Sequence, residues 1–273
     1  MQQFGRDPVN ETQWRALDAI GAPWQSPSPH DWLLAIDDTD NLTSRGTGFL
    51  ARQLALRLGE HGLADVKAIT RHQLLVDPRI PYTSHNSSAC LVLAAIKDRR
   101  AVFDYTCDYL LKESAEGSDA GTVLVRRDAL PQEMRDFGAA AKVSVLEQND
   151  ARALAARHGI DMAGLTGTGG GVIGALAATG LNASGRDGRF LWIKRLRSMS
   201  CERHSAATLQ QLTGIAVQTI DGNAIPHDDI VDLGEWPRAV FVNEHPTLLV
   251  EKTDEPIFSG WRSASKNHIR QHF

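Results

Sequence analysis

The sequence predicts an α/β or α+β fold, because short apolar runs alternate with amphipathic segments from residue 32 to about residue 197. Glycine, proline or polar clusters separate these segments, as they do between strands and helices. Beyond residue 205 the apolar runs become shorter and are bounded by turn residues, which predicts a small β-rich appendage. We therefore expect an N-terminal helical extension (1–28), a central α/β region (29–204) and a β-rich C-terminal segment (205–273).

The individual elements follow from local patterns. WLLAI at 32–36 is an apolar run ended by charge, which is typical of a buried strand. Residues 48–62 have apolar side chains at helical spacing and end at Gly62, which predicts a helix with one buried face. The other expected strands are 66–70, 89–96, 121–127, 189–196, 216–222, 238–244 and 247–253. The other expected helices are 101–114, 131–141, one capped by Asn149 or Asp150, and one that follows a glycine-rich loop within 164–181. The polar closing segment, 259–273, is expected to be partly mobile.

Composition excludes several classes of protein. The formal net charge of −4 gives no global basic field for nucleic acid, and the one dense basic stretch, 194–204, is expected to be an exposed face. The three cysteines form no CxxC pair, so we expect neither a zinc site nor a disulfide framework. No apolar run has the length of a signal peptide or a membrane span, so we expect no membrane partner and a cytoplasmic protein.

An acidic loop follows the first expected strand. Asp37, Asp38 and Asp40 lie at the carboxyl end of that strand, where ligands often bind in α/β sheets. Adjacent carboxylates repel one another unless they are neutralised, and Mg²⁺ neutralises them with oxygen ligands while it retains water for a phosphate. If the extended chain continues, Asp38 and Asp40 face one side and Asp37 the other. The alternative is that one aspartate caps the next helix and the others are solvated.

The start of that next helix has the features of a phosphate site. Gly46 and Gly48 flank Thr47, where free N–H groups and the positive helix end suit a phosphate oxygen. Arg45 is placed to add a bidentate contact. The Thr47 hydroxyl has three possible roles: capping the helix, holding Mg²⁺-bound water, or accepting a phosphoryl group.

Two further loops are rich in small or polar residues. The loop LTGTGGGVIG (165–174) lacks the Lys-Ser/Thr of a Walker A loop, and neither a clear strand before it nor a ribose-binding acid after it supports a Rossmann motif. It remains suited to an anion through its backbone N–H groups, and a purely structural turn is the alternative. Its candidate ligand-binding residues are Gly167, Gly169, Gly170, Gly171 and Gly174. The loop IPYTSHNSS (80–88) offers hydrogen-bonding side chains from Tyr82, Thr83, Ser84, His85, Asn86 and Ser87.

Three segments, in this order, resemble one family. AIDDTDNLTSRGTGFLA, DPRIPYTSHNSSA and KVSVLEQNDARALAARHGIDMAGLTGTGGGVIGALAATGL are similar to motifs in the N-terminal part of the archaeal tRNA 2-agmatinylcytidine synthetases, which attach agmatine to the wobble cytidine of an isoleucine tRNA. The resemblance covers about residues 32–182. It implies a kinase-like mixed sheet with helices and an accompanying ferredoxin-like part, together forming a nucleotide-binding region within 29–204.

The resemblance also implies chemistry. Members of that family use ATP and Mg²⁺ to activate a cytosine oxygen by phosphorylation and carry an autophosphorylated threonine, which corresponds to Thr47. It implies catalytic roles for Asp37, Asp38 and Thr47 and metal binding by Asp37, Asp38 and Asp40. It also implies phosphate contacts from the glycine-rich loop. His85 and Asn86 are further candidate cofactor-binding residues, in a loop that departs from the family pattern, so contacts to the substrate there are expected to differ.

Longer members of the family end in an oligonucleotide-binding barrel and a zinc ribbon, for which the last 70 or so residues have neither the length nor the cysteines. We therefore expect a Mg-ATP-dependent phosphotransferase or ligase-like enzyme whose acceptor is either tRNA or a small molecule. Two alternatives remain open. The first is a haloacid-dehalogenase-like phosphatase with Asp38 as nucleophile, since IDDTDNL approximates its motif. The second is a non-catalytic nucleotide- or RNA-binding homologue.

Overall fold

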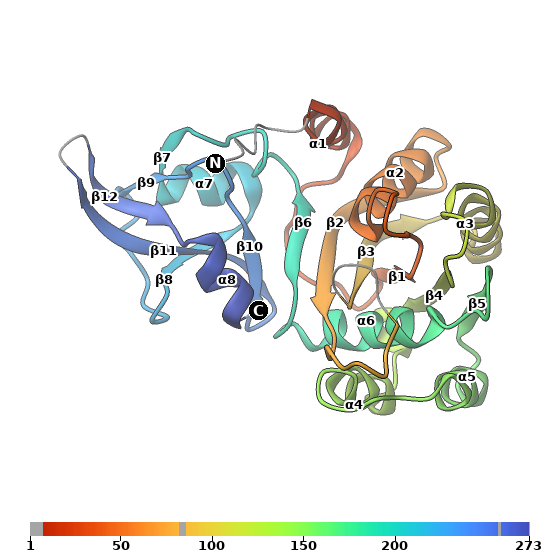
Figure 1. Ribbon diagram of the computed structural model, residues 1–273. Coiled ribbons are helices and arrows are strands. Elements are labelled where there is room, and N and C mark those ends of the chain that lie inside the picture. The colour runs from red at the N-terminus through yellow and green to blue at the C-terminus, as the bar shows by residue number, and fades with distance from the viewer. Residues whose placement is uncertain (1–7, 82–85, 256–257, 273) are drawn as a thin grey trace.

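The computed structural model describes residues 8–81, 86–255 and 258–272. These residues form a mixed α+β fold in which helices cover a long sheet (Figure 1), so the predicted fold class is confirmed. The helices are α1 (Pro8–Ile20), α2 (Thr47–Glu60), α3 (Arg99–Glu113), α4 (Gln132–Ala140), α5 (Gln148–Arg157), α6 (Val172–Ser184), α7 (Ala206–Thr213) and α8 (Lys266–His272), with a 3-10 turn at Arg127–Ala129.

The strands form one continuous path. They are β1 (Trp32–Asp37), β2 (Ala64–Gln73), β3 (Ser87–Ile96), β4 (Gly121–Arg126), β5 (Asp161–Gly164), β6 (Arg189–Ile193), β7 (Arg203–Ser205), β8 (Ala216–Thr219), β9 (Ile230–Asp232), β10 (Ala239–Val242), β11 (His245–Glu255) and β12 (Phe258–Ser263). Their order is β5-β4-β1-β3-β2-β6-β10-β11-β12-β9-β7, and β8 pairs with β11. Neighbouring strands are antiparallel from β5 through to β12.

The central strand β1 is buried on both faces, which explains its continuous apolar sequence. Leu34 and Ile36 belong to a core shared with α1, α2 and α3. Leu33 and Ala35 point the other way, into a core shared with α4, α5 and α6. The region from β1 to β6 is therefore a three-layer arrangement, with the sheet between two sets of helices.

The C-terminal part is joined to this arrangement through a narrow pairing. β10 pairs with β6 through Val240 and Arg189, and β11 and β12 extend the sheet from there (Figure 1). The expected strands at 216–222, 238–244 and 247–253 are found as β8, β10 and β11. The division into 1–28, 29–204 and 205–273 stays a prediction, because the strand path itself runs through the later boundary.

Several local predictions were wrong or incomplete. Helix α5 begins at Gln148 with Glu147 as its N-cap, so Asn149 and Asp150 lie inside its first turn and do not cap it. The short strand β5 was missed because it is an edge strand with no fully buried residue, and α7 was missed as well. The closing segment, for which no element was expected, contains α8 and most of β12, and its partial mobility stays a prediction. β12 pairs with β11, and Ile269 of α8 is buried against Val240 and Leu249.

The basic stretch at 194–204 is not simply an exposed face, so that prediction was also incomplete. Arg197 is buried, and its guanidinium lies 4.0 Å from the ring centre of Trp236 and 5.3 Å from that of Trp14. Lys194 donates to the carbonyl of Gly21 at 2.6 Å. No carboxylate partner of Arg197 is found in the described part of the chain, and stacking on aromatic faces favours its burial instead. This stacking also connects α1 to the chain after β6.

Candidate functional site

A pocket of about 290 Å³ lies where β1 ends. Because β3 and β4 run antiparallel to β1, their first residues lie beside the last residue of β1. Asp37 pairs in register with Gly121, the first residue of β4, so Asp119 lies close to the acidic loop. Ser87, the first residue of β3, lines the pocket from the other neighbouring strand.

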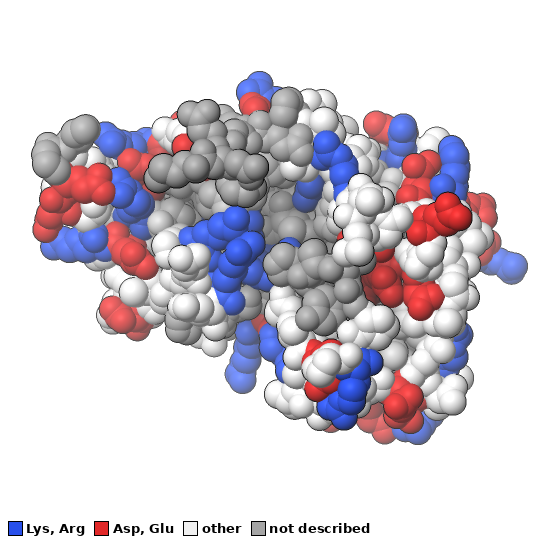
Figure 2. Space-filling view, in the orientation of Figure 1, with Lys and Arg blue, Asp and Glu red and all other residues white. Residues whose placement is uncertain are grey.

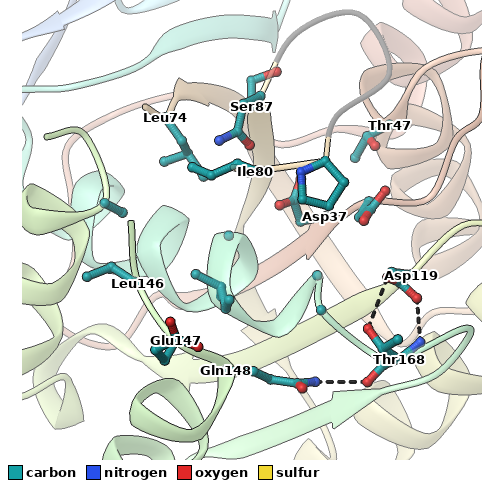
Figure 3. A pocket seen from close by; sticks show the side chains of 18 of the residues that line it. Asp37, Thr47, Leu74, Ile80, Ser87, Asp119, Leu146, Glu147, Gln148 and Thr168 are labelled. Carbon is teal, nitrogen blue, oxygen red and sulfur yellow. Dashed lines mark hydrogen bonds between the residues drawn. The ribbon is translucent and has the colours of Figure 1, made fainter. Parts of the chain in front are cut away.

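The two sides of the pocket differ in character (Figure 3). Asp37, Thr47, Asp119 and Thr168 lie toward one side, and Asp38 and Asp40 also line the pocket. Leu74, Ile80 and Leu146 lie toward the other side, which we call the apolar side, with the polar Ser87 and Glu147 beside them. A pocket with two such sides suits a ligand that has a charged end and an apolar, flat end.

All three loop aspartates line the pocket, because the chain turns directly after β1. Asp38 has a φ of +51°, in the left-handed region, so the extended geometry ends there. The alternation expected for an extended chain therefore does not apply, and Asp37 is not directed away from Asp38 and Asp40.

Burial and mutual repulsion raise the pKa values of two of these aspartates. Burial, followed by repulsion from Asp38, raises the pKa of Asp37 to about 7. Burial, followed by repulsion from Asp119 and Asp40, raises the pKa of Asp38 to about 6. Near neutral pH the folded protein thus holds carboxylates that favour either protons or a cation.

The carboxylates of the pocket suit Mg²⁺ when water and substrate phosphates complete its coordination. Over the described part of the chain, no group of three or more His, Cys, Asp or Glu side chains is arranged to hold a metal ion. Mg²⁺, however, is commonly held by one or two carboxylates and completed by water and substrate phosphates. Asp37 and Asp38, with raised pKa values at one pocket wall, match that requirement, and the predicted triad with Asp40 stays a prediction.

Thr47 and Asp40 are joined directly. The Thr47 hydroxyl donates to Asp40 Oδ1 at 2.8 Å and accepts from the Thr39 hydroxyl at 3.1 Å. The Thr47 N–H also lies 3.3 Å from Asp40 Oδ1. The alternative in which one aspartate of the acidic loop caps the following helix therefore applies to Asp40. Its carboxylate accepts a hydrogen bond from an N–H of the first turn of α2. Thr47 itself is the first helical residue, and Gly46 is the N-cap.

The glycine-rich loop is held in place by Asp119. Its carboxylate accepts from the N–H of Thr168 and, at 3.0 Å, from the Thr168 hydroxyl. The Asp119 carbonyl accepts from the N–H of Gly171 at 2.8 Å. Gln148 adds a second anchor, since its side-chain amide donates to the carbonyls of Thr168 and Gly169 at 2.9 and 2.8 Å. Several loop N–H groups are therefore used to shape the loop itself.

We expect Asp119→Ala to lower the free energy of unfolding by about 0.5–1.5 kcal/mol, because the N–H and hydroxyl of Thr168 lose their carboxylate acceptor at a solvent-exposed place. We also expect weaker ATP binding in calorimetry, because Thr168 and the glycine-rich loop lose their position. Asp98→Ala is the matched control, since Asp98 accepts two N–H bonds at the start of α3, away from the pocket. Equal ATP affinity of the two variants would contradict this role of Asp119.

The remaining predicted site residues divide into three groups. Gly170, Gly171, Gly174 and Asn86 line the pocket. Arg45, Gly46, Gly167 and Gly169 do not line it, and the Arg45 guanidinium lies 4.7 Å from the ring centre of Phe49. His85 lies outside the described residues.

Sequence reasoning missed Asp119 and Gln148. Asp119 stands in SDAG, directly before an expected strand, but only the antiparallel pairing of β4 with β1 brings it to the acidic loop. The sequence did offer one indication for Gln148, because it lies in one of the segments that carry the family resemblance.

Comparisons with known proteins support the motif-based resemblance. No protein-family model matches the chain. The isoleucine-tRNA 2-agmatinylcytidine synthetase TiaS of Cenarchaeum symbiosum is 29% identical over 153 residues, which are 54% of this chain and 32% of that protein. An uncharacterized protein of Methanocaldococcus jannaschii is 30% identical over 158 residues, 57% of this chain and 51% of its own length.

Among solved structures, the complex of TiaS with its isoleucine tRNA and ATP matches with a TM-score of 0.49 and 26% identity, over 55% of this chain and 36% of that chain. Apo TiaS matches with a TM-score of 0.48 and 25% identity, over 55% and 35%. The chain thus spans about a third to a half of the length of the curated relatives that it matches. No helix among the described residues has the length and apolar character to cross a membrane. Over about half of its length, this chain resembles the tRNA 2-agmatinylcytidine synthetase TiaS, as its motifs predicted.

Proposed function

We propose that the protein is a Mg-ATP-dependent phosphotransferase or ligase-like enzyme. The observation that carries this proposal is the convergence of Asp37, Asp38 and Asp119 with the glycine-rich loop at one pocket wall. An ATP phosphate cannot enter this acidic wall unless a cation neutralises it, so metal and nucleotide would bind together. The relative named as a tRNA 2-agmatinylcytidine synthetase supports a ligase-like reaction.

In this proposal each wall of the pocket has a role. Asp37 and Asp38 hold Mg²⁺, which supplies charge neutralisation for the transferred phosphoryl group. Asp119, through Thr168, keeps the glycine-rich loop beside the phosphates. The base and ribose lie toward the apolar side formed by residues such as Leu74 and Leu146.

Thr47 is proposed as an acceptor of the γ-phosphoryl group. Its hydroxyl already donates to Asp40, so nucleophile and base are within hydrogen-bonding distance. The new bond joins Thr47 Oγ to phosphorus, the β–γ bridging bond of ATP breaks, ADP leaves, and Asp40 takes the hydroxyl proton. The final acceptor, tRNA or a small molecule, is left open in this proposal, as is the cytoplasmic location.

We expect Asp38→Asn to reduce Mg-ATP turnover by about 100-fold or more, because a ligand charge at the phosphates is lost. The assay measures phosphate release and protein labelling from γ-labelled ATP, with the label mapped by mass spectrometry to Thr47. Circular dichroism checks that the fold is retained. Asp104→Asn, at an exposed position on α3, is the control and is expected to behave as the wild type.

Unchanged turnover and labelling in Asp38→Asn would refute the assignment. Phosphate release from simple phosphoesters without ATP would favour the phosphatase alternative with Asp38 as nucleophile. Calorimetric binding of ATP without turnover or labelling would favour the non-catalytic nucleotide- or RNA-binding alternative.

A further inference from the structure

Three arginines lie on or directly before neighbouring strands of the sheet, near the pocket. Arg71 on β2 is directly opposite Arg189 on β6 in the antiparallel register. Arg238 immediately precedes β10, which pairs with β6 through Val240 and Arg189. Like charges placed opposite each other destabilise a sheet, so this arrangement is unfavourable without a compensating group.

Helix α8 adds two further cations to this place. Ile269 packs against Val240 and Leu249, which fixes α8 on β10 and β11. Lys266 and Arg270 are four residues apart and therefore lie on the same helix face. Figure 2 shows Lys and Arg atoms gathered where Figure 1 places α8. We call Arg71, Arg189, Arg238, Lys266 and Arg270 the basic cluster.

The five members of the basic cluster act on one another. Arg270 lowers the pKa of Arg71, Arg189, Arg238 and Lys266, although burial is the larger cause for each. Burial and these repulsions bring the pKa values of Arg71 and Arg238 to about 10. The strand register and the packing of α8 on β10 and β11 place the five groups where such repulsion acts.

No carboxylate in the structurally described part of the chain forms an ion pair with the basic cluster. Asp187, which lies near Arg189, is paired with His72 and Lys142 instead. Among the described residues, Arg189 is almost fully buried, at 5% exposure, and its Nε has no hydrogen-bond partner. The Nε of Arg238 has none in this part of the chain either, but its guanidinium stacks 5.1 Å from the ring centre of Trp236. A buried guanidinium donor without an acceptor, as at Arg189, indicates a place prepared for an anion.

The basic cluster adjoins the acidic pocket. Arg71 Nε donates to the hydroxyl of Ser87 at 2.8 Å, and Ser87 lines the pocket. Asp40 and Asp37 also act on the charge of Arg71 from the pocket side. A ligand held by the basic cluster would therefore extend toward the site of the proposed phosphoryl transfer.

We propose that the basic cluster binds phosphate groups of the acceptor substrate and directs that acceptor into the pocket. This proposal rests on the proposed function, and it assigns a role to the C-terminal residues that form β10 and α8. Guanidinium groups recognise phosphate oxygens by paired N–H bonds, and five cations can engage more than one phosphate. The phosphates come either from an RNA backbone or from a small phosphorylated molecule.

The test reverses charge on the exposed face of α8 in the full-length protein. In the double variant Lys266→Glu/Arg270→Glu, we expect binding of a fluorescent 20-nucleotide RNA, measured by anisotropy at low salt, to weaken at least about tenfold. The matched control is Arg100→Glu/Lys112→Glu on α3, where both side chains are more than 80% exposed and the change in net charge is the same. The control variant is expected to bind like the wild type.

A parallel arm measures inorganic triphosphate by calorimetry. Loss of RNA binding in the α8 variant identifies a polynucleotide acceptor, and loss of triphosphate binding alone identifies a small phosphorylated one. If neither ligand binds more weakly to the α8 variant than to the control, the proposal is overturned. It is also overturned if the α8 variant loses Mg-ATP affinity to the same extent, because the basic cluster would then belong to the nucleotide site.

Different results would refute the proposed function and the proposed role of the basic cluster. Turnover of ATP that depends on Asp38, combined with unchanged anion binding in the α8 variant, refutes only the role of the basic cluster. Turnover that is independent of Asp38, combined with anion binding that is lost in the α8 variant, refutes only the proposed function.

Discussion

At pH 8 and without divalent metal, the Asp37→Asn variant is expected to unfold at a higher denaturant concentration than the wild-type protein. The reason is the carboxyl of Asp37, whose pKa is raised from 3.8 to about 7 by burial and by the charge of Asp38. At pH 8 this carboxyl is ionised in the folded protein, which is costly in a buried place. Asparagine has nearly the same shape and no charge, so we expect a gain on the order of 2 kcal/mol in the free energy of unfolding.

The contribution of Asp37 to the free energy of unfolding depends on pH. Between about pH 4 and pH 7 the folded protein keeps the Asp37 proton that the unfolded chain has released. The free energy of unfolding of the wild type therefore falls as pH rises through this window, and it levels off above it. Asp37→Asn removes this contribution, so the two proteins should have similar stability near pH 4 and diverge toward pH 8.

Denaturant titrations at several pH values measure this difference, with Asp104→Asn as an exposed control that should follow the wild type. Adding Mg²⁺ at pH 8 should stabilise the wild type more than the variant, because the variant has lost a charged ligand. Mg-ATP turnover should be lost in Asp37→Asn. If the free energies of unfolding of the variant and the wild type change in parallel with pH, Asp37 is not the carboxylate whose ionisation destabilises the fold.

The second large effect is expected at Gly174, in the first turn of α6. A methyl group at this position would overlap with the carboxylate of Asp37 and would crowd the hydroxyl of Ser88. In an isolated helix, Gly→Ala stabilises by about 1 kcal/mol. Here we expect Gly174→Ala to destabilise by about 1–3 kcal/mol, because overpacking between α6 and the end of β1 outweighs helix propensity. We also expect turnover to fall at least about 100-fold, because Asp37 is displaced.

Gly170→Ala is the matched control in the same loop. A Cβ there would lie 3.5 Å from Thr168 Oγ1 and 3.6 Å from Asp119 Oδ2, which are ordinary contacts. We expect its midpoint of thermal unfolding to stay close to that of the wild type, whereas that of Gly174→Ala falls. If Gly174→Ala is instead more stable than the wild type, the close approach of α6 to Asp37 is refuted.

Local sequence patterns predicted most of the first part of the fold. The strand at 32–36 was predicted because β1 is buried on both faces and its sequence is therefore continuously apolar. The helix at 48–62 was predicted because α2 is buried on one face, which requires apolar residues at helical spacing. The pattern failed at β5 and β12, because edge strands and half-exposed strands have no strong apolar periodicity. It also failed at Arg197, whose burial depends on two tryptophans far away in the chain.

The sequence by itself determined which groups the site contains in two of its loops: the aspartates after β1, Thr47 at a helix start and the glycines before α6. These features are local, since each depends on a few neighbouring residues and on the strand or helix beside them. The order of these loops was also sufficient to predict the resemblance to the tRNA-modifying enzymes.

Only the tertiary structure decided how these groups are combined. Antiparallel pairing of β1 with β4 brought Asp119 to the acidic loop, and the left-handed turn at Asp38 directed three aspartates into one pocket. The pairing of β6 with β2 and β10 likewise brought together Arg71, Arg189 and Arg238, and packing of α8 on β10 and β11 added Lys266 and Arg270. Such contacts depend on strand register between distant segments, and the energy that fixes register comes from burial of the whole sheet rather than from any short stretch of sequence.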